Sequence, residues 1–353
     1  MDNTDRIKKI LIVILALLLG FIGFLIINII TNATKTDYHS STDRITELYN
    51  DVVGQLAEGK SSISIDSASE SDVRTVVELV YDQPEYFWLA RQYSISSAGS
   101  RFMVQFTVYY KDHSTMYSQA KDVADEIIAG VPENANDYEK VKYVHDELCN
   151  RIRYVDTNDE SEHNIYGALV NGESVCEGYA KAFMFVLNRA GIETKYFSGT
   201  SLKDGEAVPH AWNGAYLDGE FYYFDITWDD IESEYISYAE FGLNSVDIMR
   251  NHTFDEYHPM IESSATKCNY YVYNDFILSE YSKDNVAKIV KKQGNIVDIK
   301  CTSIVAYNKL VLAIANPYQL NEILTAAESE NTGFNRFSYM LDDSTYCVRL
   351  YFD

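Results

Sequence analysis

The longest hydrophobic segment of the chain runs from Ile10 to Ile30 and contains no charged residue. As a helix it would be about 30 Å long, which matches the hydrocarbon core of a bilayer. Arg6, Lys8 and Lys9 precede it, and cationic residues favour the cytoplasmic side. The pattern predicts a single-pass anchor in the plasma membrane, with a cytoplasmic N-terminus and extracytoplasmic residues from about position 32 onward. Cleavage as a signal peptide is the alternative, although signal peptides have a shorter apolar region.

Changes in the pattern along the chain predict four parts. These are a stub and anchor at residues 1–31, a small α/β unit at 32–130, a central domain at 131–262 and a second α/β unit at 263–353.

Alternating and helical spacings of apolar residues predict the elements of the two α/β units. In the first unit they predict helices at residues 36–57 and 69–81 and strands at 61–66 and 102–110. In the second they predict helices at 283–292 and 317–328 and strands at 269–278, 295–302, 309–315 and 346–352.

The central domain opens on an amphipathic helix from Asp137 to about Tyr154, with His145 on its apolar stripe. We expect a hydrogen-bonded core histidine at such a position. The acidic segment Asp156–Glu162 could suit calcium, but it lacks the turn glycine and terminal glutamate of an EF-hand loop. We interpret it as a solvated loop.

Composition limits the classes of partner. The 353 residues include 53 acidic and 29 basic ones, which gives a formal charge of −24, and 46% of the chain is hydrophobic. This hydrophobic content excludes a disordered acidic tail. The negative charge argues against nucleic acid as a partner, because nucleic acid would repel it. Oligomeric state is not indicated.

The five cysteines are widely spaced and form no C-x-x-C pair, which argues against a zinc module or a disulfide framework. An odd number leaves at least one thiol without a partner in the chain. Cys176 precedes an apolar helical stripe that ends at Gly191, and Ser174 and Glu177 have the spacing of a capping box. The first turn of a helix favours a thiolate. A buried structural cysteine is the alternative.

A β-hairpin is predicted downstream of this helix. Asp218-Gly219 is a typical two-residue turn between strands rich in aromatic residues. In the register that this turn sets, His210 falls opposite Thr227 and diagonally across from Asp225 on one face. We therefore expect the side chains of His210 and Asp225 to meet.

Cys176, His210 and Asp225 would together supply a nucleophile, its base and a carboxylate that orients the imidazole. A cross-strand surface pair is the alternative for His210 and Asp225. A metal site made of the three is disfavoured, because their spacing has no zinc signature. We predict no metal and no cofactor.

The segments VCEGYAKAFMFVLNRAGIETKYFSGT and PHAWNGAYLDGEFYYFDITWDD resemble the transglutaminase-like superfamily of bacterial membrane and secreted proteins. The resemblance covers about residues 137–258. It implies an α+β fold whose papain/transglutaminase-like core packs a cysteine-bearing helix on an antiparallel sheet that bears the histidine and aspartate. It also implies that Cys176 is the nucleophile, His210 the general acid/base and Asp225 the orienting carboxylate. His252 and His258 have no counterpart in it.

The resemblance further implies acyl transfer through a thioester, after which water or an amine releases the product. The oxyanion would bind the backbone amide of Cys176 and a second donor, for which Tyr166 and Trp212 are candidates; a core aromatic is the alternative for each. We thus expect an extracytoplasmic enzyme that acts on protein or peptide amides, as a transglutaminase, deamidase or cysteine protease, in the cell envelope. A non-catalytic binding or adhesion module that keeps the fold is the alternative.

Overall fold

The computed structural model describes residues 43–66, 68–203, 205–230, 236–329, 331–333 and 336–352. These residues form two compact units. The first contains the described residues up to Val80 together with Arg91–Val108, and the second contains Tyr81–Ala90 and the described residues from Tyr109 onward. The predicted anchor, Ile10–Ile30, lies outside the described residues. Within them, none of the helices combines the length and the apolar character needed to cross a membrane.

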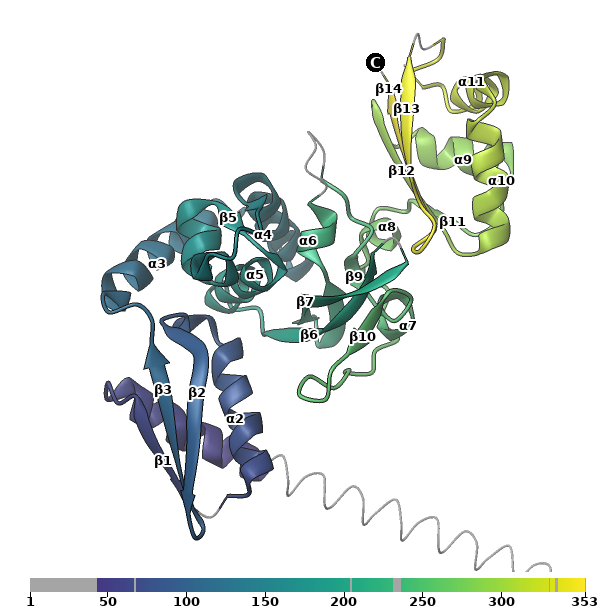
Figure 1. The fold of residues 1–353 in the computed structure, drawn as a ribbon. Coiled ribbons are helices and arrows are strands. Elements are labelled where there is room, and N and C mark those ends of the chain that lie inside the picture. The colour runs from purple at the N-terminus through teal and green to yellow at the C-terminus, as the bar shows by residue number, and fades with distance from the viewer. Residues whose placement is uncertain are drawn as a thin grey trace, which may run out of the picture. The chain divides into compact units, whose positions relative to one another are not determined.

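The first unit is built on a three-stranded sheet (Figure 1). Its elements are a helix at residues 43–57, β1 (Ser62–Asp66), α2 (Glu70–Asp82), β2 (Leu89–Ala98) and β3 (Arg101–Val108). Alternate residues of β1 and β3, such as Ile63 and Val104, are fully buried beneath the valines of α2. The predicted helices and strands of this unit are confirmed within the described residues. Strand β2 was not predicted, because it is an edge strand whose side chains are mostly polar and exposed.

Three helices form one side of the central domain: α3 (His113–Ala129), α4 (Asp137–Arg151) and α5 (Cys176–Arg189). A capping box starts α4, since the side chains of Asn136 and Glu139 each accept a hydrogen bond from the other's backbone N–H. Helix α3 falls in the second unit, whereas the sequence pattern places it before the boundary at residue 130. It packs on α5 in part through an edge-on contact of Tyr117 with Phe185.

The capping box predicted at the start of α5 is wrong. The Ser174 hydroxyl donates to the backbone oxygen of Glu162 at 2.8 Å, and the carboxylate of Glu177 pairs with Lys181 at 2.7 Å. A chain segment therefore covers the helix start where a side-chain cap was expected. The end of the helix is as predicted, because Gly191 adopts a left-handed conformation with φ of 83°.

A five-stranded antiparallel sheet packs against α5 in the order β10-β6-β7-β8-β9 (Figure 1). The strands are β6 (Thr194–Lys203), β7 (Glu206–Leu217), β8 (Glu220–Phe224), β9 (Phe241–Leu243) and β10 (His252–Phe254). The amide of Asn213 on β7 donates to the backbone oxygen of Ala180 at 3.0 Å and so fixes the sheet to the helix. The expected α+β core, with the cysteine on a helix and the histidine on an antiparallel sheet, is present.

The register of the predicted hairpin is confirmed, but the hairpin is shorter than expected. Pairing ends where Asn213 lies opposite Phe224, and the chain then turns into α6 (Ile226–Asp229). His210 is therefore not paired with Thr227, and Asp225 is the N-cap of α6 and not a strand residue.

Short elements connect these parts. They are the 3₁₀ turns Pro84–Tyr86 and Glu160–His163, the parallel pair β4 (Arg153–Tyr154) and β5 (Glu173–Ser174), the π-turn Gly167–Asn171, and α7 (Ser245–Ile248).

The C-terminal segment builds a four-stranded sheet with helices over one apolar face. Its elements are α8 (Tyr270–Tyr273), β11 (Ile277–Leu278), α9 (Lys283–Val290), β12 (Ile296–Cys301), α10 (Ile304–Ile314), α11 (Pro317–Ala326), β13 (Phe337–Asp342) and β14 (Cys347–Phe352). The strand predicted at residues 309–315 is wrong, because they lie mostly in α10, which Ser303 caps. The strand predicted at 269–278 is instead α8 followed by the short β11.

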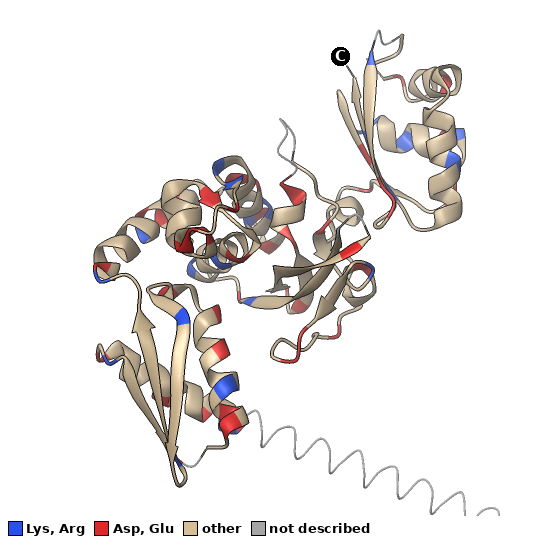
Figure 2. Cartoon of the chain, viewed as in Figure 1, with Lys and Arg blue, Asp and Glu red and all other residues tan. Residues whose placement is uncertain are grey.

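Acidic residues are spread over helices and loops of both units, with lysines and arginines among them (Figure 2). Several pair along a helix, as Glu70 does with Arg74 and Glu147 with Arg151. The negative charge is thus a property of the general surface.

Gly178, in the first turn of α5, leaves room for the segment that covers the helix start. A Cβ there would lie 2.1 Å from the Ser174 hydroxyl and 2.6 Å from the backbone oxygen of Glu162. We expect Gly178→Ala to lower the free energy of unfolding by about 1–3 kcal/mol, as overpacking does. Thermal unfolding followed by circular dichroism measures this.

Gly54→Ala is the matched control, because nothing lies within 4 Å of the added Cβ in that helix. It should leave stability unchanged or raise it. Equal melting temperatures for the two variants would contradict the expected clash.

Candidate active site

Cys176 is the first residue of α5 and is partly exposed, whereas Cys149, Cys268, Cys301 and Cys347 are buried. All five thiols are free. Burial raises the pKa of the four buried thiols, which keeps them protonated. No side chain caps α5, so the amides of its first turn face the region of the Cys176 thiol.

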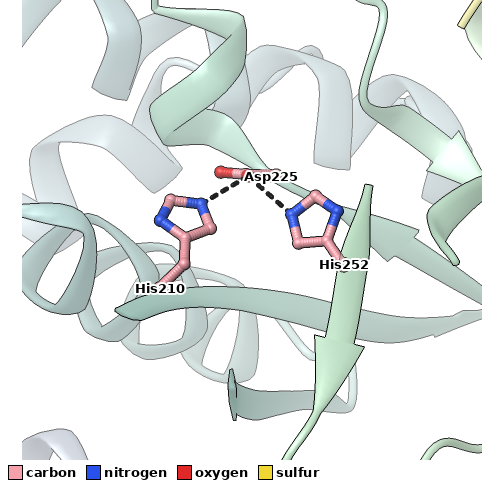
Figure 3. Close-up of side chains that lie close together, drawn as sticks. All are labelled: His210, Asp225 and His252. Carbon is pink, nitrogen blue, oxygen red and sulfur yellow. Dashed lines mark hydrogen bonds and ion pairs between the residues drawn. The ribbon is translucent and has the colours of Figure 1, made fainter. Parts of the chain in front are cut away.

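His210 and Asp225 form a buried hydrogen-bonded pair (Figure 3). The ring Nε2 of His210 lies 2.6 Å from Oδ2 of Asp225, and the two residues are 7% and 1% exposed. The other oxygen of Asp225, Oδ1, accepts the backbone N–H groups of Thr227 and Trp228 at 3.1 and 3.2 Å. The capping of α6 thus fixes the carboxylate that meets the imidazole.

The charges in this site favour an imidazolium. Burial lowers the pKa of His210, but the carboxylate of Asp225 and a hydrogen bond with Cys176 outweigh it and raise that pKa to about 10. Burial raises the pKa of Asp225, and the neighbouring histidines outweigh it and hold that pKa well below its usual range. At neutral pH, His210 therefore donates from Nε2 to an ionised Asp225, which leaves Nδ1 for the thiol of Cys176.

The structure thus brings together the three residues singled out in the sequence. The side-chain meeting of His210 and Asp225 is confirmed, through an Asp225 that caps a helix where a strand residue was expected. The catalytic roles of the three residues stay a prediction.

His252 is part of the same cluster, although no pattern in the sequence predicted it. Its Nε2 lies 3.1 Å from Oδ2 of Asp225, and its Nδ1 lies 2.6 Å from Oδ1 of Asn251 (Figure 3). It comes from the three-residue strand β10, which pairs with β6 at the sheet edge. A pairing between segments this far apart leaves no periodic signal near His252.

Two tryptophans enclose the imidazoles. The ring of Trp228 lies 5.4 Å from His210 and 5.1 Å from His252, and the ring of Trp212 lies 6.2 and 4.7 Å from them. Trp212 is 1% exposed and packs edge-on against Phe254. Its burial is typical of a core aromatic, and its Nε1 has no hydrogen-bond partner among the described residues. These rings reduce the access of water to the ion pair.

His210, Asp225 and His252 each offer a ligand atom, and these atoms lie within 4.8 Å of one another. Two imidazoles and a carboxylate could hold a divalent transition metal. Two ligands of a tetrahedral zinc would be about 3.3 Å apart, whereas the His210 and Asp225 atoms are 2.6 Å apart. The geometry favours a charge-assisted hydrogen bond over a shared metal.

His145 is a fully buried core histidine, as predicted, and contacts Asp146 at 3.0 Å and Asp229 at 3.2 Å. Residues 156–160 of the acidic segment are exposed, as predicted for a solvated loop, whereas Glu162 at its end is buried. Its carboxylate accepts the backbone N–H of Thr157 at 2.9 Å. The acidic loop thus closes on itself and covers the start of α5.

A cavity of about 510 Å³ adjoins this site. Its lining includes Trp228, Asp230, Glu240 and Arg349. It meets the imidazole cluster through Trp228, and it does not reach the thiol of Cys176.

Comparison with known proteins identifies the central part of the chain. Residues 121–226 match the model of the Transglutaminase-like superfamily, and this range includes Cys176, His210 and Asp225. The chain contains a transglutaminase-like domain.

Similarity to curated proteins is distant. The chain is 28% identical over 122 residues to Kyphoscoliosis peptidase of Homo sapiens, over 31% of this chain and 18% of that protein. The chain therefore spans about a fifth of the length of that curated relative.

Two solved structures also resemble part of this chain. A TGase is 16% identical with a TM-score of 0.29, over 47% of this chain and 50% of that one. A candidate cysteine protease from Cytophaga hutchinsonii is 18% identical with a TM-score of 0.28, over 38% and 61%.

His210 should make stability depend on pH, because its pKa is about 10 in the folded chain against an ordinary value of 6.5. A raised pKa stabilises the fold fully below pH 6.5, and this stabilisation is lost as the pH rises through the folded value. We expect the urea midpoint of the wild type, relative to that of His210→Gln, to decline from about pH 6.5 to about pH 10. Glutamine does not titrate, so a difference that stays constant with pH would contradict the prediction.

Proposed function

We propose that this chain is a thiol-dependent acyltransferase or hydrolase of protein or peptide amides, with Cys176 as its nucleophile. The observation that supports it best is the buried 2.6 Å contact of His210 with Asp225, next to the one partly exposed cysteine of the chain. The match to the transglutaminase-like superfamily supports the same chemistry.

The first half of the proposed reaction makes a thioester. The Cys176 thiolate attacks the amide carbonyl and forms a C–S bond, and the carbonyl electrons move to the oxygen. The first-turn amide of α5 at Cys176 donates to this oxyanion. When the C–N bond breaks, Nδ1 of His210 gives its proton to the departing nitrogen, so the amine leaves neutral.

The second half releases the acyl group. Neutral His210 takes a proton at Nδ1 from water or from a second amine, which attacks the thioester carbonyl. The C–S bond breaks, and the thiolate forms again beside the imidazolium. Water yields a hydrolysed or deamidated product, and an amine yields a new amide. Asp225 keeps Nε2 protonated throughout, so Nδ1 is always the nitrogen that exchanges protons.

Peptide and protein amides are the proposed substrates. The curated relative is named a peptidase, and its similarity to this chain extends over 122 residues.

We also propose that the reaction takes place outside the cytoplasm, on a membrane-anchored chain. This rests on the charge-free Ile10–Ile30 segment and the cations that precede it. Substrates would then be proteins or peptides of the cell envelope.

A thiol-directed alkylating agent should label Cys176 selectively. Cys176 is partly exposed and can meet the agent, whereas the other four cysteines are buried with raised pKa values that keep them protonated. We expect His210→Ala to slow the labelling about tenfold or more. Mass spectrometry of the digested chain measures the rate at each cysteine.

The buried cysteines serve as internal references in the same sample. His258→Ala is a control, because His258 is also a buried histidine paired with carboxylates but contacts Asp82 and Asp255 instead. If Cys176 reacts like a model thiol and is indifferent to His210, the proposal fails.

Envelope peptides incubated with the full chain should change in mass in a way that requires Cys176. Deamidation, hydrolysis and crosslinking give different mass changes, so mass spectrometry separates them. Cys176→Ala, which keeps the helix, should abolish the change. Identical peptide spectra for the two proteins would instead favour a non-catalytic binding module.

A further inference from the structure

The carboxylate of Asp225 serves two histidines through a single oxygen (Figure 3). His210 and His252 both point Nε2 at Oδ2, at 2.6 and 3.1 Å. The Cys-His-Asp reaction outlined above uses only His210. His252 is 3% exposed, and such a buried polar contact on a catalytic carboxylate requires an explanation.

We propose that His252 is a positioning residue of this site, which holds the Asp225 carboxylate in place and sets the upper pH limit of the Cys176–His210 pair. This inference rests on the proposed function. His252 hydrogen-bonds to Asp225 through Nε2, its other ring nitrogen faces Asn251, and its ring lies 5.6 Å from that of His210.

Asp225 has no spare hydrogen-bonding capacity in this arrangement. Two backbone amides of α6 occupy Oδ1, and two imidazoles occupy Oδ2. A carboxylate offers about four lone-pair positions, so the group is held on both sides. Its plane, and with it the direction of the His210 ring, is fixed by bonds from three separate segments.

Sharing one oxygen also has an electrostatic effect. Each N–H donor on Oδ2 compensates part of the negative charge that the other donor experiences. His252 therefore weakens the hold of Asp225 on the His210 proton. Without His252, the imidazolium of His210 should persist to higher pH.

A buried chain of polar groups keeps His252 in place. Asn251 meets the His252 ring at 2.6 Å, and its amide donates to Oε1 of Glu240 at 2.8 Å. Burial, with repulsion by Asp225, raises the pKa of Glu240. The series Glu240, Asn251, His252 and Asp225 thus reaches the imidazole of His210 without a water molecule.

Other titratable groups face this series from the elements packed around it. They are Cys176 on α5, Cys149 on α4, Asp229 on α6 and Asp342 on β13. His145 neutralises part of the charge of Asp229. These groups are common to the wild type and the variants below, so a difference between the proteins reports on His252.

The test compares two alkylating agents on the full chain. In both reactions the Cys176 thiolate forms a C–S bond and iodide leaves. Iodoacetate is negative and is favoured beside an imidazolium, whereas iodoacetamide is neutral. The ratio of their rates at Cys176 therefore falls as His210 loses its proton, with a midpoint near pH 10 in the wild type.

We expect His252→Phe to move this midpoint upward by about one pH unit. His252→Gln should stay near the wild type, because its amide nitrogen can donate to Asp225 in place of Nε2. His258→Phe is the control for the loss of a buried histidine, and its midpoint should not move even if the chain is less stable.

An unchanged or lower midpoint in His252→Phe overturns the inference, as does an equal shift in His252→Gln. If His252→Phe does not fold, Asn251→Ala should show a smaller upward shift, and no shift there also overturns it. A wild type without a His210-dependent reaction at Cys176 refutes both the proposed function and this inference. A normal wild type with an unshifted His252→Phe refutes this inference alone.

Discussion

The site depends on one buried carboxylate. Asp225 is 1% exposed and keeps its negative charge only because four donors surround it. These donors come from the start of α6, from β7 and from β10, so the burial of one charge requires the correct assembly of all three. A neutral residue in place of Asp225 would remove the charge that raises the pKa of His210. If the carboxylate were exposed, water would weaken its effect on that pKa. Burial of the Asp225 carboxylate costs free energy, but it also strengthens the effect of this charge on the pKa of His210.

The same carboxylate explains why α6 and the sheet edge belong to the site. A two-residue turn brings β8 back along β7, and the chain then leaves the sheet at the point where a helix must start. An aspartate at that point satisfies the helix amides with one oxygen and offers the other to the sheet. The loop that covers the start of α5 also helps to position the site. The backbone oxygen of Glu162 in this loop accepts the Val175 N–H just before Cys176. The capping of α6 thus positions the Asp225 end of the Cys-His-Asp series, and a backbone contact of the covering loop positions the Cys176 end.

The sequence predicted those parts of the site that depend on neighbouring residues, namely the hairpin register and the cysteine-bearing helix. The Asp218-Gly219 turn fixes a register that brings His210 and Asp225 within reach, and Gly191 marks the end of the cysteine-bearing helix. His252 could not be found in this way, because a three-residue strand carries no periodicity and its pairing with β6 is non-local. The strand predicted at residues 309–315 is wrong for another reason. A short apolar run fits either a strand or a buried helix. Here the Ser303 cap upstream favours the helix α10. At Ser174 the spacing of a capping box was present, but tertiary contacts with Glu162 used the hydroxyl instead.

The distribution of the thiols has a consequence for oxidation. Cys176 is partly exposed, and the other four cysteines are buried and unpaired. An oxidant that converts the Cys176 thiolate to a sulfenic acid would meet no accessible second thiol on the same chain to form a disulfide. Recovery would then need a small thiol from outside, and continued exposure would carry the sulfur on to irreversible sulfinic and sulfonic acids. Outside the cytoplasm, prolonged oxidation would therefore permanently remove the proposed nucleophile of this chain.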